Sequence, residues 1–101
     1  MVALLEQLLP ELRRLCVKYA VKRLDLIGSA SRADFDPARS DVDFVVEFDD
    51  PRRDAADRFF GLMVDLEDLV GRRIDLVSYR GIRNPYFKKA VDATRVPLYA
   101  A

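Results

Sequence analysis

Two aspartates, Asp41 and Asp43, stand at the beginning of an apolar segment that is typical of a buried β-strand. Residues two apart in a strand point to the same side of a sheet, so both carboxylates would lie on one face. Like charges held this close repel one another unless a positive charge lies between them, and a divalent cation is the simplest such charge. The alternative is a pair of ordinary solvent-facing side chains on a sheet with one wet face.

A third aspartate, Asp75, lies within the apolar segment at residues 74–77. A carboxylate buried in such a strand normally needs a partner. If this strand pairs with the one that begins at Asp41, the three carboxylates would share a face and could bind one or two Mg²⁺ ions. The alternative is an ion pair between Asp75 and a neighbouring arginine such as Arg73.

A candidate phosphate-binding turn, Gly28 followed by Ser29, comes shortly before the aspartate pair. A glycine at the end of a strand lets the backbone come close to a ligand, and N–H groups at the start of a following helix point toward anions. Ser29 adds a hydroxyl donor, and Arg32 adds a positive charge. Most Gly-Ser pairs are simple turns, so this pair gains its weight from the position just upstream of Asp41.

The composition narrows the chemistry further. The chain has no histidine, which excludes His-based catalysis and His metal sites, so any metal would be held mainly by oxygen. With 101 residues we expect a single domain, 1–101. Its 17 basic and 17 acidic residues balance, so net charge argues neither for nor against nucleic acid. One cysteine and the lack of a long apolar run predict a cytoplasmic protein.

The helices that must position these residues are visible in the spacing of apolar side chains. A helix is predicted from Pro10, with Cys16 on its buried face. A longer helix is predicted over residues 53–70 with Gly71 as its stop, and Phe59 and Phe60 are expected in its core face. The remaining expectations are short helical turns at 2–9 and 29–32, a loop at 34–40 and a last helix from the Asn84-Pro85 pair.

Strands are predicted at residues 23–27, 41–48 and 73–78, with a short fourth strand at 96–99. Pro97 cannot donate a backbone hydrogen bond, which places the last strand at an edge of the sheet. Strands separated by helices indicate a small domain in which helices are layered against a β-sheet. The pattern alone leaves open whether the sheet is parallel or mixed.

Taken together, Gly-Ser, an arginine four positions after the glycine, and Asp-x-Asp resemble the nucleotidyltransferase superfamily of the DNA polymerase β type. The likeness is to its small branch, the minimal nucleotidyltransferases. The segment SDVDFVVEF is similar to the family's Ser-Asp-(Ile/Val)-Asp strand, and GRRIDLVS is similar to its third-carboxylate strand. The likeness covers about residues 12–99. The spacer at 30–40 is one residue longer than usual, and Ala33 stands where many members have glycine.

The resemblance implies an α+β fold, with a small mixed β-sheet and flanking helices. It implies a reaction in which an acceptor hydroxyl attacks the α-phosphate of ATP, with two Mg²⁺ ions or Mn²⁺, and pyrophosphate leaves. It assigns catalysis and metal binding to Asp41, Asp43 and Asp75, and nucleotide binding to Gly28, Ser29, Arg32 and Ser40.

Three functions are consistent with this family. The first is AMP transfer to a protein hydroxyl, because small members are typically encoded with a HEPN-domain toxin whose tyrosine the antitoxin modifies. The second is a non-catalytic binding module that neutralises such a partner by contact. The third is a transferase for small molecules, whose relatives usually carry an extra acceptor domain.

For the first function we expect a HEPN-domain partner and a nucleoside triphosphate, with no direct contact to nucleic acid or membrane. A chain of 101 residues leaves no room for an acceptor domain, so a second molecule must complete the site. Half of that acceptor site is expected around Tyr79, Arg80, Arg83 and Tyr86, just after the Asp75 strand.

Overall fold

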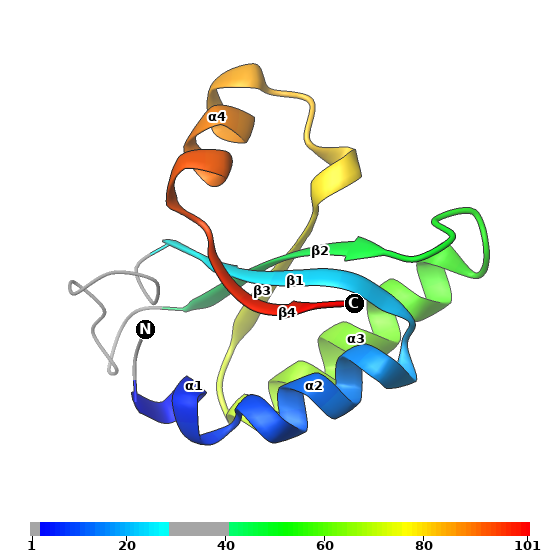
Figure 1. The fold of residues 1–101 in the computed structure, drawn as a ribbon, viewed down its shortest axis with the longest axis vertical. Coiled ribbons are helices and arrows are strands. Elements are labelled where there is room, and N and C mark those ends of the chain that lie inside the picture. Colours follow the sequence, from blue (N-terminus) through cyan, green and yellow to red (C-terminus); the bar gives the residue numbers. More distant parts are fainter. Residues whose placement is uncertain (1–2, 29–40) are drawn as a thin grey trace.

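The computed structural model describes residues 3–28 and 41–101, which form one sheet with helices on both faces (Figure 1). No helix in these two ranges is long and apolar enough to cross a membrane. The helices are α1 (Ala3–Gln7), α2 (Leu9–Lys18), α3 (Ala55–Val70) and α4 (Pro85–Thr94), with a 3₁₀ turn η2 (Tyr79–Gly81). The strands are β1 (Val21–Ile27), β2 (Val42–Phe48), β3 (Ile74–Ser78) and β4 (Val96–Ala100).

The sheet is mixed, which confirms the expected α+β fold. Its order in the described residues is β3-β2-β1-β4. β1 runs antiparallel to both β2 and β4, whereas β2 and β3 are parallel because α3 carries the chain back between them. β4 forms an edge of the sheet, as Pro97 predicted.

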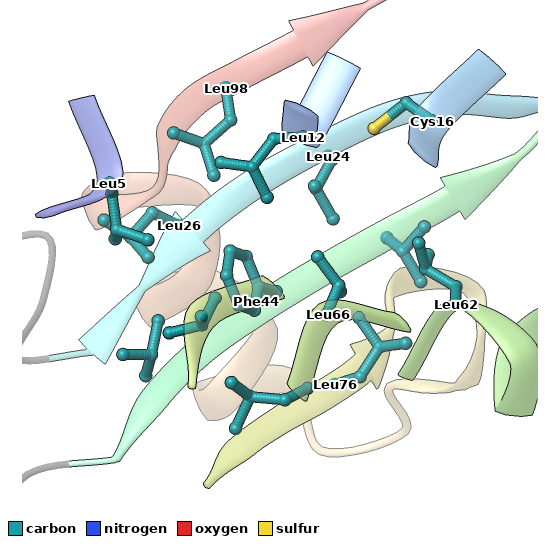
Figure 2. Packing of buried hydrophobic residues seen from close by; sticks show 14 of the residues in the cluster. Leu5, Leu12, Cys16, Leu24, Leu26, Phe44, Leu62, Leu66, Leu76 and Leu98 are labelled. Carbon is teal, nitrogen blue, oxygen red and sulfur yellow. The ribbon is translucent and has the colours of Figure 1, made fainter. Parts of the chain in front are cut away.

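The main core lies between the sheet and helices α1, α2 and α3 (Figure 2). Cys16 is fully buried there, as expected. The expectation for Phe60 is wrong, because its side chain is 58 % exposed. Two positions along a helix amount to roughly 200°, so Phe60 points away from the face that buries Leu62. The residues that fill this core include Leu12, Leu24, Leu26, Phe44, Leu62, Leu66 and Leu76.

The opposite face of the sheet is covered by α4 (Figure 1). Val91 of α4 packs with Ile27 of β1 and Val45 of β2 in a small second core. The Asn84 side chain accepts hydrogen bonds from the backbone N–H groups of Tyr86 (2.9 Å) and Phe87 (3.2 Å), which confirms the predicted start of this helix.

An ion pair connects the end of α4 to the sheet. Arg95, which follows α4, places its Nε 3.2 Å from Oδ2 of Asp25, a fully buried carboxylate of β1. Arg23 holds the same carboxylate at 2.8 Å. Two guanidinium groups therefore balance the buried charge, and α4 is fixed over this face by its last turn as well as by Val91.

Arg58 of α3 connects chain segments at the end of the sheet that lies away from Asp43 and Asp75. Its five N–H groups donate to five backbone carbonyls, at 2.6 to 2.9 Å, and its guanidinium lies 4.7 Å from the centre of the Phe48 ring. The bonds join the chain before β1 to the chain between β2 and α3, so they fix these strands relative to one another. The acceptors are the carbonyl oxygens of Tyr19, Ala20, Asp49, Asp50 and Arg53.

Candidate functional site

The strand register brings two of the predicted aspartates together. Asp43 of β2 is the direct partner of Asp75 of β3 in the parallel pair. Paired strands lie about 4.8 Å apart, and residues in register face the same side. Both carboxylates therefore lie on the face of the sheet that α4 covers.

Gly28, directly after β1, brings the backbone up to this pair. Ile27 is the register partner of Asp43, so Gly28 emerges beside the Asp43 side chain. Its φ of +72° lies in the left-handed region, and a Cβ at this position would collide with the Asp43 carboxylate. The positive φ favours glycine here, and a larger residue would force the Asp43 carboxylate to move.

A pocket of about 280 Å³ contains these residues. On the sheet side it is lined by Ile27, Gly28, Asp43, Asp75 and Val77. The other wall comes from α4, through the apolar residues Phe87, Ala90 and Val91 and through Thr94, whose hydroxyl donates to the Ala90 carbonyl. The pocket is therefore a cleft between two carboxylates and an apolar helix face, which is the usual character of a ligand site.

The pKa of Asp43 is raised above its usual value, first by burial and then by the negative charges of Asp75 and Asp41. Asp41 is exposed and directly precedes β2. A carboxylate in this setting is stabilised in its charged form by a nearby cation. Asp43 is therefore more than a solvent-facing polar residue, which was the alternative reading of the pair.

Asp75 is exposed, so the expectation that it is buried in its strand is wrong. Its neighbours Ile74 and Leu76 are buried because alternate residues of β3 face the main core. Among residues 3–28 and 41–101 no ion pair joins Asp75 to Arg73, the arginine named in the alternative interpretation.

The donor set suits a hard divalent cation, because only carboxylate oxygens are offered. In the described part of the chain, however, no three acidic or cysteine side chains are already placed to share one ion. Asp41 and Asp75 are exposed, so their side chains are free to turn. The three predicted ligands thus form a pair at the pocket, Asp43 and Asp75, with Asp41 close enough to act on Asp43 by charge.

The other predicted nucleotide-binding residues, Ser29, Arg32 and Ser40, lie outside the described residues, as do the helical turn at 29–32 and the loop at 34–40. Of the expected acceptor surface, Arg80, Arg83 and Tyr86 are exposed. Tyr79 instead donates its hydroxyl to Asp92 of α4, at 2.8 Å.

The apolar wall of the pocket was missed by sequence reasoning. Its α4 residues recur at i, i+3, i+4 and i+7 from Phe87, which marks one helix face. This pattern was a usable signal for a face that meets other residues. It does not reveal that the face meets carboxylates, because that depends on how α4 crosses the sheet.

Comparison with known proteins places these features in context. Residues 5–96 match the family described as nucleotidyltransferase domain. The chain is 36 % identical over 75 residues to MJ1379 of Methanocaldococcus jannaschii, which is named as a predicted protein adenylyltransferase. That alignment covers 74 % of this chain and 74 % of the relative.

Two solved structures are similar in fold. One is of a protein described as a minimal nucleotidyltransferase by prediction, with a TM-score of 0.77, 29 % identity, and coverage of 92 % of this chain and 91 % of that chain. The other is the tri-AMPylated HEPN toxin of Shewanella oneidensis in complex with MNT antitoxin. It gives a TM-score of 0.63 and 17 % identity over 95 % of this chain and 72 % of that chain, a likeness of fold.

Proposed function

This chain belongs to the nucleotidyltransferase domain family, and on that premise we propose that it transfers AMP from ATP to a hydroxyl group of a second protein. The observation that carries the proposal is the pairing of Asp43 with Asp75 beside Gly28, in one pocket. Carboxylates next to a close-approaching backbone provide for both a divalent cation and a triphosphate. The name of the relative MJ1379 supports AMP as the transferred group and a protein as the acceptor.

In the proposed reaction the acceptor oxygen forms a bond to the α-phosphorus of ATP. The bond from that phosphorus to the oxygen bridging to the β-phosphate breaks, and pyrophosphate leaves. Asp75, exposed at the pocket, accepts the proton of the hydroxyl group. Most of the rate enhancement then comes from positioning and from neutralised charge, as in phosphoryl transfer generally.

Asp41 and Asp43 would hold the metal, and Asp75 would join them after its side chain turns inward. Bound Mg²⁺, as one or two ions, or Mn²⁺ in its place, would neutralise charge on the phosphate oxygens. Burial, and then the negative charges of Asp75 and Asp41, raise the pKa of Asp43, and the cation would offset both effects by stabilising the charged carboxylate. Ser29, Arg32 and Ser40 keep their predicted role as phosphate contacts.

We propose a cytoplasmic HEPN-domain toxin as the acceptor, with this chain as its antitoxin. The fold shared with the antitoxin of the Shewanella oneidensis complex supports this partner, since the toxin in that complex is AMPylated. A charged, bulky adduct on a tyrosine near a nuclease site would block RNA by sterics and repulsion.

The test is to incubate the chain with ATP, Mg²⁺ and a HEPN-domain protein from the same organism, and then to measure the intact mass of both proteins. The expected result is a partner mass that grows by one or more AMP units, and no growth with Asp41→Asn. If the partner is inhibited without a change in mass, and Asp41→Asn inhibits it equally well, the chain is a binding module of the same fold.

A further inference from the structure

A second hollow, of about 440 Å³, adjoins the pocket that holds the carboxylates. The two hollows share Val77 and Phe87 as lining residues. The second one continues along the chain between β3 and α4, past Ile82 to Arg83. Together they form a groove, the Phe87 groove, that leads from Asp75 over Phe87 to Arg83.

The Phe87 groove is aromatic in its middle and positively charged at its far end. Phe87 is 43 % exposed, although it is a large apolar side chain. Arg83 is exposed, and its Nη1 donates to the backbone carbonyl of Arg80 at 3.1 Å, which holds the guanidinium near the groove. Among the described residues Arg83, which precedes α4, has no carboxylate partner, whereas Lys88 in α4 is paired with Asp92 at 3.4 Å.

We propose that the Phe87 groove binds the segment of the acceptor protein that carries the reactive hydroxyl. The ring of an acceptor tyrosine packs against Phe87, and an acidic residue next to that tyrosine pairs with Arg83. This inference rests on the proposed function, because a hydroxyl acceptor must reach Asp75. It goes further by assigning the surface that binds the acceptor and the acidic character of the segment that surrounds its tyrosine.

The shape and charge of the groove favour the acceptor over the adenine of ATP as the occupant. An adenine ring is neutral and offers no charge complementary to the exposed Arg83. The groove also extends well beyond the carboxylate pocket, by a hollow larger than that pocket itself. An extended peptide that passes the reacting atoms fits such a groove, because side chains on either side of the tyrosine are also covered.

The experiment measures binding and transfer separately, with random copolymers of Glu and Tyr and of Lys and Tyr as probes. Binding of each copolymer is measured by calorimetry without ATP. Transfer is measured with ATP labelled at its α-phosphate, as KM for the copolymer and KM for ATP. The variants are Phe87→Ala, Phe87→Leu and Arg83→Glu, and thermal melting shows that each is folded.

Two matched controls lie on the opposite side of the sheet from α4. Phe60→Ala removes another exposed phenylalanine, 58 % accessible, from α3. Arg13→Glu reverses another exposed arginine, on α2. Both controls are expected to bind and transfer like the wild type.

The wild type is expected to bind the acidic copolymer and to bind the basic one far more weakly. Phe87→Ala should weaken binding of the acidic copolymer about tenfold and raise its KM, with KM for ATP unchanged. Phe87→Leu should bind the acidic copolymer with an affinity between those of the wild type and Phe87→Ala. Arg83→Glu should give a similar loss that shrinks as salt rises.

The proposal is overturned if Phe87→Ala and Arg83→Glu bind the acidic copolymer as tightly as the wild type does. It is also overturned if Phe87→Ala raises KM for ATP and leaves the copolymer unaffected, because the ring then packs on adenine. A wild type that binds the acidic copolymer through Phe87 and Arg83 but transfers no AMP upholds the groove and contradicts the proposed function.

Discussion

Replacing Gly28 with alanine is expected to damage the site far more than the fold, and Gly71 offers a matched control. Both glycines have a left-handed backbone, with φ of +72° and +75°. Alanine in this conformation costs roughly 1–2 kcal/mol, so both variants should lose about that much unfolding free energy. A loss of this size leaves a typical domain, stable by roughly 5–15 kcal/mol, folded at room temperature.

The two variants differ in what the added methyl group meets. At Gly71 nothing lies within 4 Å of it, whereas at Gly28 it runs into the Asp43 carboxylate. Asp43 must then turn away or the end of β1 must shift, and a displacement of about 1 Å at a reacting site can cost roughly 100-fold in rate. We expect Gly28→Ala to lose AMP transfer by about that factor, together with Mg²⁺-dependent ATP binding.

Thermal melting and calorimetric titration of ATP with and without Mg²⁺ test this pair of variants. Similar melting temperatures, with ATP binding kept only in Gly71→Ala, are the expected result. Equal ATP binding and equal transfer in both variants would refute the argument that Gly28 gives Asp43 its place.

Three further predictions concern the fold and its charges. Arg58→Lys should lose about 2–3 kcal/mol of unfolding free energy in chemical denaturation, because lysine cannot supply five donors. Three of the carbonyls that Arg58 binds have no other backbone donor in the described residues. The control Arg13→Lys should lose no unfolding free energy, and equal losses in the two variants would contradict this role of Arg58. Asp43→Asn should melt at a higher temperature than wild type in metal-free buffer at neutral pH. Because the pKa of Asp43 is raised in the fold, its carboxyl group makes its full contribution to stability below the usual pKa of 3.8, and this contribution is lost as pH rises through the raised pKa. The gain in melting temperature of Asp43→Asn should therefore vanish in acid. A gain that persists in acid would be contrary evidence. Burial raises the pKa of the Cys16 thiol to about 12, so a thiol reagent should react at the rate of global unfolding, and fast labelling of native protein would show that the core is open.

Pairing of the two carboxylate strands was a condition of the predicted site, and the structure meets it with a parallel pair, an orientation that the sequence pattern had left open. Period-two alternation in the paired strands then puts Asp43 and Asp75 on one face. The glycine at the end of β1 was recognised by its place in the chain. Its collision partner, the Asp43 carboxylate, follows only from the register of β1 and β2.

Other features depend on contacts between distant residues and carry no local signal. Arg58 lies on the buried face of α3, although arginine side chains normally reach solvent. Only the folded chain shows the backbone carbonyls that surround it. Asp25 is likewise buried because arginines from its own strand and from the end of α4 meet it. Asp75 was expected to be buried from the apolar residues around it, but the alternation of β3 leaves its side chain exposed.

In the proposed function the carboxylates at this pocket direct attack on the α-phosphate of ATP. The most direct measurement runs two reactions with the HEPN-domain partner, one with ATP labelled at the α-phosphate and one with ATP labelled at the γ-phosphate. We expect label in the partner only from the α-phosphate and γ label in released pyrophosphate. Asp75→Asn should lose about 100-fold or more in transfer, with ATP binding retained. Label in the partner from the γ-phosphate, or transfer by Asp75→Asn at the wild-type rate, would contradict the proposed function.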